Sequence, residues 1–221
     1  MARCRSGIKP VQTNLNGGPD LAKVYFNYSA MNAGKSTVLL QASHNYRERG
    51  MQTLLLTAAL DNRVGVGVIG SRIGLEAEAE TFGPDDNLFD RIEEKTTQGP
   101  LHCVLVDEAQ FLTQEQVWHL CRVADRLGVP IMCYGLRTDF QGKLFPGSAA
   151  LLALADALRE IRTICWCGRK ATMVVRRNSE GQVLEEGDQV AIGGEESYVS
   201  LCRRHWEDRD LGPAGQLKMF L

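Results

Sequence analysis

The sequence lacks the features of a secreted, membrane-bound or strongly charged protein. Its 221 residues include 25 Lys and Arg against 27 Asp and Glu, and the net charge of -2 gives no electrostatic reason to expect a nucleic-acid or membrane partner. The N-terminal stretch has no apolar core, so it is neither a signal peptide nor a membrane span. We therefore expect a cytoplasmic protein in which residues 1–20, rich in Gly, Pro and Asn, form a flexible leader.

A disulfide framework is a second feature that the sequence does not suggest. The chain has seven cysteines, an odd number, and no secretory signal, which together favour a reducing compartment. Cys103, Cys121 and Cys133 lie within apolar runs and are expected in the core. Some of the other cysteines therefore need another explanation. Internal repeats and low-complexity tracts are absent as well.

Strand and helix patterns alternate up to about residue 160. Short apolar or alternating runs predict strands at 23–28, 53–57, 102–106 and 130–134, and helical spacing predicts helices at 35–49, 113–127 and 148–158. This alternation is typical of an α/β protein with a doubly wound parallel sheet. After residue 162 the helical periods give way to Cys, Gly, Arg and turn formers. We therefore predict an α/β domain at residues 21–160 and a small β-rich domain with the C-terminal tail at 161–221.

Residues 29–36, SAMNAGKS, lie between the first predicted strand and the first predicted helix. This is the position of a P-loop of pattern G-x-x-x-x-G-K-[ST], although a serine replaces its first glycine. Gly34 permits the tight turn, Lys35 in an exposed loop would reach the β- and γ-phosphates, and Ser36 would face Mg²⁺. The alternative is a chance GKS at a helix N-terminus. The predicted ATP-binding residues of the loop are Ser29, Ala30, Met31, Asn32, Ala33, Gly34, Lys35 and Ser36.

An acidic pair, Asp107 and Glu108, follows the apolar run at 103–106. An aspartate at the carboxyl end of a buried strand lies where open α/β sheets bind their ligands, so Asp107 can orient Mg²⁺. Glu108 is a candidate general base for an attacking hydroxyl or water. The alternative is a solvated acidic turn. The P-loop and this pair together predict a P-loop NTPase-like fold.

Two close pairs of soft ligands lie in the β-rich domain, Cys165 with Cys167 and Cys202 with His205. Zinc binds a Cys₃His set tetrahedrally, and such a site can fold a small unit that has little core of its own. The C-x-C pair is tighter than the usual spacing, and ordinary thiols are the alternative. Basic residues around the site could suggest a nucleic-acid-binding ribbon, but solvated faces suit the slightly acidic chain better.

Five blocks of the sequence, in order, carry a resemblance to a known family: YFNYSAMNAGKST, VLVDEAQF, CYGLRTDF, CWCGRK and VAIGGEESYVSLCRRH. Together they resemble thymidine kinase of the zinc-containing type found in bacteria and animal cytosol, over residues 23–205. The serine that opens the phosphate loop resembles the bacterial members. The resemblance implies ATP-dependent phosphorylation of the 5′-hydroxyl of thymidine with Mg²⁺ and structural Zn²⁺. It also implies a homotetramer and feedback inhibition by dTTP.

The same resemblance implies roles for individual residues. Glu108 would be the base that accepts the hydroxyl proton, and Gln110 would belong with Asp107 to the ATP site. Asp61 and Arg63 match positions near the phosphates and the metal, and Phe140 matches an aromatic that packs against the nucleobase. The loop that encloses the nucleoside would contain Gln189, Val190, Ala191, Ile192, Gly193 and Tyr198. A nearby zinc would limit the conformations that this glycine-rich loop loses on binding.

Two other classes of function use similar motifs. A P-loop ATPase with a zinc ribbon that acts on nucleic acid would use Glu108 to activate water, but such motors usually need a second ATPase domain or ring partners and long basic tracts. Neither is visible in this sequence. A catalytically silent nucleotide sensor would not need an intact Lys35, Asp107 and Glu108. Measuring ATP consumption with thymidine, with single-stranded DNA or with neither separates the three.

Overall fold

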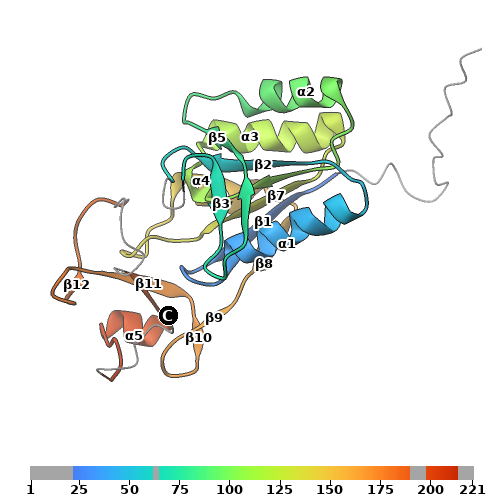
Figure 1. Ribbon diagram of the computed structural model, residues 1–221. Helices are drawn as coiled ribbons and strands as arrows, with labels where there is room; N and C mark the ends of the chain where they lie inside the picture. Colours follow the sequence, from blue (N-terminus) through green and yellow to red (C-terminus); the bar gives the residue numbers. More distant parts are fainter. Residues whose placement is uncertain (1–21, 62–64, 190–197, 214–221) are drawn as a thin grey trace, which may run out of the picture.

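The larger part of the molecule is a six-stranded sheet in the order β5-β2-β6-β7-β1-β8, with every neighbouring pair parallel (Figure 1). The computed structural model describes residues 22–61, 65–189 and 198–213, and the predicted leader lies outside these ranges. The strands are β1 (Val24–Ser29), β2 (Thr53–Ala58), β5 (Glu80–Phe82), β6 (Cys103–Val106), β7 (Ile131–Leu136) and β8 (Ala157–Glu160). All four residues of β6 are buried, as expected for a strand that is covered on both faces.

Helices cover both faces of this sheet (Figure 1). They are α1 (Lys35–Glu48), α2 (Leu88–Gln98), α3 (Gln114–Arg122) and α4 (Pro146–Leu154). On one face α2, α3 and α4 share a buried cluster with strand residues such as Phe26 and Leu56. On the other face Leu39 of α1 packs in a second cluster, which Ile69 of the hairpin β3 (Val68–Gly70) and β4 (Glu76–Glu78) completes. The predicted doubly wound α/β fold is therefore confirmed.

The helix predicted at 148–158 is wrong in its last residues, because α4 ends at Leu154 and β8 follows. The reason is a contact with the start of β1 that the local sequence does not reveal. The Asp156 carboxylate accepts a hydrogen bond from Val24 N at 2.8 Å, and Asp156 N donates to Val24 O at 2.9 Å. These bonds end the helix and place the next residues beside β1 as an edge strand, with Leu158 half-exposed.

The helix predicted at 113–127 is confirmed in position. It consists of α3 and of a π-helical turn, η2 (Val123–Leu127), that continues α3. Thr113 caps it as expected, in a capping box with Gln116. The helix α2 was not predicted, although Asn87 before it and Gly99 after it are ordinary helix-end signals. The Asn87 side chain accepts hydrogen bonds from Phe89 N and Asp90 N.

The chain after β8 forms a small β-rich unit, as predicted. Its elements are β9 (Thr163–Ile164), β10 (Lys170–Ala171), β11 (Met173–Arg177), β12 (Val183–Leu184), β13 (Tyr198–Leu201) and α5 (Arg203–Glu207). Antiparallel strands make a sheet in the order β12-β11-β13, and β9 pairs with β10. The buried residues of its core are Cys165, Ala171, Val175, Leu201 and Cys202. We keep residue 160, the last residue of β8, as the proposed domain boundary.

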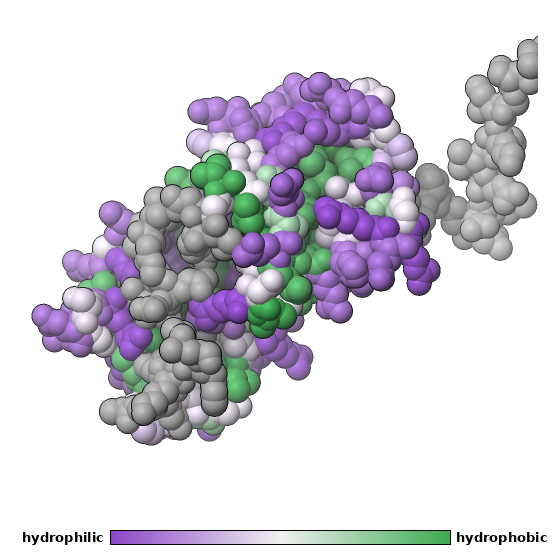
Figure 2. All heavy atoms as spheres, viewed as in Figure 1, coloured by the Kyte–Doolittle hydropathy of each residue, from purple (hydrophilic) through white to green (hydrophobic). Residues whose placement is uncertain are grey.

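The surface over α2 is mainly hydrophilic, whereas apolar residues show around the β3–β4 hairpin (Figure 2). Val66 and Ile73, beside and within this hairpin, are 78% and 71% exposed. Among the described residues, no helix has the length and apolar character that crossing a membrane requires.

Candidate active site and metal centre

The predicted phosphate loop, residues 29–36, leaves the sheet at the carboxyl end of β1 and leads directly into α1, which is the position expected from the sequence. Asn32 and Gly34 have φ angles of 60° and 80°, so the chain turns sharply before the first helical residue, Lys35. A helix N-terminus presents the backbone N–H groups of its first turn to the preceding loop, which is how it binds an anion. Ser29 is buried at the end of β1, and its Oγ donates to Ala30 O at 2.6 Å.

Lys35 does not lie in an exposed loop, and that expectation is wrong. The residue is only 8% exposed, because its side chain folds back over the loop. Its Nζ donates to Ala30 O at 3.4 Å, a long hydrogen bond that is readily exchanged for a stronger acceptor. The ammonium group is therefore held inside the loop, where an anion would sit.

Asp107 and Ser36 meet across the site although they are 71 residues apart in the chain. Ser36 Oγ donates to Asp107 Oδ2 at 2.9 Å. Asp107 is 3% exposed, and its burial, together with the adjacent Glu108 carboxylate, raises its pKa to about 7. A hydroxyl oxygen and a carboxylate oxygen that lie side by side are suitable ligands for Mg²⁺, and a divalent cation would offset the cost of burying the Asp107 charge. These two residues therefore fit the predicted magnesium site.

Glu108 follows at a backbone position that is unusual for a residue with a side chain. Its φ of 50° lies in the left-handed region, and the residue is 8% exposed. Glu108 N donates to Asp107 Oδ1 at 3.0 Å, and its side-chain Oε2 accepts a hydrogen bond from Gln110 Nε2. The two acids thus lie at the carboxyl end of β6, beside the phosphate loop.

The residues predicted to bind the nucleoside are described only in part. Phe140 is 5% exposed, and the Arg176 guanidinium lies 4.2 Å from the centre of its ring. Gln189 Nε2 donates to Asp139 Oδ2 at 2.8 Å, close to Phe140 in the chain. Tyr198 opens β13, opposite Arg176. Val190, Ala191, Ile192 and Gly193 lie outside the described residues.

Of the predicted phosphate and metal pair Asp61 and Arg63, only Asp61 is described. Asp61 N donates to Ala58 O at 2.9 Å, in the turn that follows β2. The end of β2 neighbours the end of β6, since Leu56 pairs with Val106. Arg63 lies outside the described residues, so its role stays a prediction.

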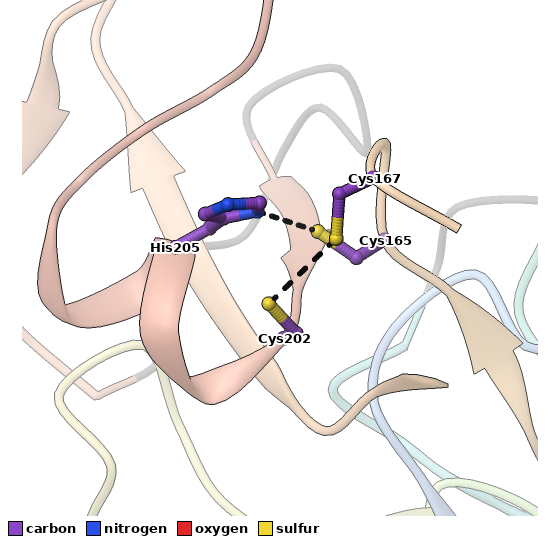
Figure 3. A group of neighbouring side chains, drawn as sticks. All are labelled: Cys165, Cys167, Cys202 and His205. Carbon is purple, nitrogen blue, oxygen red and sulfur yellow. Dashed lines mark hydrogen bonds between the residues drawn. The ribbon is translucent and has the colours of Figure 1, made fainter. Parts of the chain in front are cut away.

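The four predicted metal ligands come together in the small β-rich unit (Figure 3). Their ligand atoms all lie within 4.8 Å of one another, with 3.3 Å between Cys165 Sγ and His205 Nδ1 and 4.0 Å between Cys167 Sγ and Cys202 Sγ. Ligands at the corners of a zinc tetrahedron are separated by about 3.5 to 3.8 Å, from the usual Zn–N and Zn–S bond lengths. The cluster is consistent with a zinc site.

The local sequence orients these ligands. Gly168, with φ of 80°, closes the turn after Cys167, and its N–H donates to Cys165 O at 2.9 Å. The Trp166 ring stacks on the His205 imidazole at 4.4 Å and fixes the plane of that ligand. Backbone N–H groups lower the pKa of the Cys202 thiol, which favours the thiolate that binds metal.

Two contacts with the phosphate loop were not predicted. Ser200 Oγ, in β13, donates to Met31 O at 2.6 Å and so joins the β-rich unit to the loop. Arg72, in the turn of the β3–β4 hairpin, donates to the side-chain oxygen of Asn32. Ser200 and Met31 are 169 positions apart, and no local pattern in the sequence indicates that they meet.

Comparison with known proteins adds independent information. The sequence model of the family described as thymidine kinase matches residues 22–206. The thymidine kinase of Ruegeria pomeroyi is 65% identical over 89% of this chain and 99% of its own. The thymidine kinase of Rhizobium etli is 65% identical over 85% of this chain and 94% of its own. The thymidine kinase of Yersinia pseudotuberculosis is 57% identical over 85% of this chain and 96% of its own. The solved Pif1 helicase from Candida albicans aligns with 65% of this chain and 36% of its own, at 14% identity and a TM-score of 0.39, from which we infer nothing.

Proposed function

The chain belongs to the thymidine kinase family, and from that premise we propose how its site transfers the γ-phosphoryl group of ATP to the 5′-hydroxyl of thymidine. The products are dTMP and ADP, so the enzyme is a phosphotransferase with an alcohol acceptor. The observation that carries the mechanism is the meeting of the phosphate loop with Asp107 and Glu108 at the carboxyl ends of β1 and β6. This is where open parallel sheets bind nucleotides.

The phosphate loop holds the triphosphate. Backbone N–H groups around Gly34 and at the start of α1 bind its oxygens, and the Lys35 ammonium exchanges Ala30 O for the β- and γ-phosphates. Burial of Lys35 strengthens this interaction, because little water competes for the charge. Phosphoryl transfer depends mainly on positioning and charge stabilisation, which this loop provides.

Ser36 and Asp107 are the residues that would hold Mg²⁺, with Asp61 and Arg63 proposed nearby. When bound, the ion neutralises negative charge on the β- and γ-phosphates. Asp107 contributes by remaining where its oxygens face Ser36, since its neighbour's N–H fixes the other oxygen.

Glu108 acts as the general base in this proposal. A carboxylate oxygen accepts the proton of the thymidine 5′-hydroxyl as that oxygen forms its bond to the γ-phosphorus. The bond between the γ-phosphorus and the β–γ bridging oxygen breaks, and its electron pair leaves with ADP. The position of Glu108, one residue beyond Asp107 at the end of β6, supports this role.

Phe140, residues 189–193 and Tyr198 form the proposed nucleoside site. Phe140 offers an apolar surface on which a nucleobase can stack, and the Arg176 guanidinium restricts its ring. Gln189, at the start of the enclosing loop, is fixed to Asp139, the residue before Phe140. The start of the loop is thus hydrogen-bonded to the residue next to Phe140, which supports a shared role of the loop and Phe140 in binding the nucleoside.

Zinc is the metal that we propose for the Cys165, Cys167, Cys202 and His205 cluster. Its role would be structural, because the four side chains could supply all four ligands of a tetrahedral zinc ion. Cys202 directly follows β13, the strand that continues from the proposed nucleoside loop. A metal at this point anchors the end of that loop and limits its entropy before the nucleoside binds.

The family resemblance further supports three proposals: a cytoplasmic enzyme, a homotetramer and feedback inhibition by dTTP. Light scattering checks the tetramer, and inhibition by dTTP that rises with its concentration checks the feedback. A monomer, or a rate that dTTP leaves unchanged, would remove the corresponding proposal.

The experiment that tests the function measures ATP consumption with thymidine, with single-stranded DNA or with neither. We expect ADP and dTMP to form in equal amounts with thymidine, and little ADP without it. Stimulation by DNA instead would indicate a P-loop motor, and ATP binding without turnover in any mixture would indicate a nucleotide sensor.

A further inference from the structure

Gln110 is a buried amide whose two ends both contact the catalytic region. The residue is 1% exposed and lies in the short 3₁₀ turn η1 (Ala109–Phe111) that follows Glu108. Its Nε2 donates to Glu108 Oε2, and its Oε1 accepts from Leu136 N at 3.0 Å, where β7 ends. The amide therefore links the Glu108 carboxylate to the backbone of the neighbouring strand.

The Glu108 backbone needs such support. A residue with a side chain at φ of 50° is held in a sparsely populated conformation, which persists only when surrounding contacts impose it. Glu108 N is bonded to Asp107 Oδ1, and the carboxylate end is bonded to Gln110. Glu108 is thus held both at its backbone N–H and at its carboxylate.

The turn that carries Gln110 is itself fixed by two close approaches of glycine. A Cβ on Gly135 would lie 2.9 Å from Gln110 Oε1 and 3.0 Å from Gln110 N, so the amide packs directly on the β7 backbone. A Cβ on Gly147 would lie 2.6 Å from Ala109 O and 2.8 Å from Gln110 O, so the start of α4 packs directly on the turn. Side chains at these positions would displace the turn.

The strand end to which Gln110 bonds is also held on its other side. Ser148 is fully buried in α4, and its Oγ donates to Leu136 O at 2.5 Å while Leu136 N donates to Gln110. The Leu136 peptide groups therefore have fixed positions, and an amide bonded there is a rigid support. Side chains locked by such contacts hold a reacting group more closely than side chains that face solvent.

We propose that Gln110 is a positioning residue that orients the Glu108 carboxylate toward the nucleoside hydroxyl, in place of the direct ATP contact that the family resemblance implied. The inference rests on the proposed role of Glu108 as the base. A hydrogen bond to Oε2 restricts the rotation of the carboxylate and hence the positions that Oε1 can occupy. An amide N–H is a donor at every pH, so the hydrogen bond to Oε2 does not depend on the protonation of Gln110 itself.

The sharpest variant is Gln110→Glu, which keeps the length of the side chain and an acceptor for Leu136 N. It replaces only the N–H group that faces Glu108. At pH 8.5 the introduced carboxylate repels Glu108, and we expect kcat to fall about 10- to 100-fold, the effect of displacing a reacting group by about 1 Å. We expect the KM values for ATP and thymidine to change less than about threefold, because neither substrate loses a contact.

A pH series distinguishes this role from a merely structural one. Two buried carboxylates that face each other bind a shared proton more readily than a free carboxyl group does, so the ratio of wild-type to Gln110→Glu kcat should shrink as the pH falls from 8.5 toward 6. Gln110→Met, which has no donor at any pH, should lose kcat without that recovery. In a Glu108→Gln background, Gln110→Glu should cause little further loss, since the group it positions is already gone.

Gln116 provides the matched control. It is an equally buried glutamine whose amide donates to Gly83 O at 2.7 Å and caps α3, away from the two acids. Gln116→Glu should lower the melting temperature and leave kcat unchanged at 25 °C. Melting temperature and ATP binding are measured for every variant, so that folding and catalysis are separated.

Several results would overturn the inference while leaving the proposed function intact. These are an unchanged kcat in Gln110→Glu, a raised KM for ATP with kcat unchanged, or an additive loss in the Glu108→Gln background. Unfolding of both Gln110 variants while Gln116→Glu folds would also make Gln110 structural rather than positioning. The proposed function fails separately, if wild-type protein forms no dTMP or Glu108→Gln retains the wild-type rate.

Discussion

Replacing Asp107 by asparagine should stabilise the folded protein when Mg²⁺ and nucleotide are both absent. The same substitution should abolish catalysis when they are present. Asp107 is buried beside Glu108, and both features oppose its charge, which raises its pKa to about 7. Asparagine keeps the shape and can keep both hydrogen bonds. Its Oδ1 can accept from Glu108 N, and its Nδ2 can donate to Ser36 Oγ.

The pH dependence gives the sign and the magnitude. The pKa in the folded protein is raised above the ordinary value of 3.8, so the native state binds more protons than the unfolded chain between about pH 4 and 7. Stability from this group is fully present below pH 4, falls as the pH rises and is lost above pH 7. Each pH unit is worth about 1.4 kcal/mol, so the interval from pH 5 to 8 removes about 3 kcal/mol as an upper bound.

The assay is thermal unfolding of wild-type protein and Asp107→Asn at pH 5 and pH 8. For a chain of this size 1 kcal/mol shifts the melting temperature by about 2 to 4 °C, so the advantage of Asp107→Asn should be up to about 10 °C larger at pH 8 than at pH 5. Asp85→Asn, at an exposed position, controls for the loss of one charge. An advantage that is equal at both pH values, or larger at pH 5, would refute the reasoning.

The remaining predictions concern the phosphate loop, the metal cluster and the contact of the loop with the β-rich unit. Lys35→Ala should lower kcat/KM at least about 100-fold in a folded protein, because a preorganised charge on the phosphates is lost, and near-normal turnover would show that the loop is not the phosphate site. Elemental analysis should find about one zinc per chain, and Cys167→Ser should lower that zinc content and weaken thymidine binding. A metal-free and fully active preparation would contradict both the zinc site and its role. Ser200→Ala should weaken ATP binding about 2- to 10-fold, the worth of one hydrogen bond, when titrated against wild-type protein, and unchanged affinity would show that the Met31 contact does not support the loop.

The parts of the fold that the sequence predicted are those set by local periodicity and end signals. The α1 helix begins where Gly34 and Lys35 indicate, and β6 is a four-residue apolar run whose length and β-branched residues favour a buried strand. The β8 strand was missed because its residues continue the apolar spacing of α4, and only the bonds between Asp156 and Val24 interrupt it. The prediction failed there because a tertiary contact overrode local propensity.

In the candidate site, too, some features follow from the local sequence and others depend on tertiary contacts. Ser36, Asp107 and the four metal ligands are recognisable from residue type and spacing, and the structure brings each set together as expected. The support given by Gln110 to Glu108 depends on the glycines of other elements that let the chain approach closely. Contacts of this kind have no signature in the local sequence, and neither does the bond between Ser200 and Met31.

The measurement that tests the account most directly is the rate of phosphoryl transfer to thymidine by Glu108→Gln, with the affinities for ATP and thymidine measured alongside. The change keeps the shape of the side chain and removes the basic oxygen that would accept the hydroxyl proton. We expect turnover to fall about 10²- to 10⁴-fold while both substrates still bind, since a positioned acid–base group contributes that much. Loss of thymidine binding with an unchanged maximal rate would contradict the account: Glu108 would then be a recognition residue, and Asp61 would become the first candidate for the base.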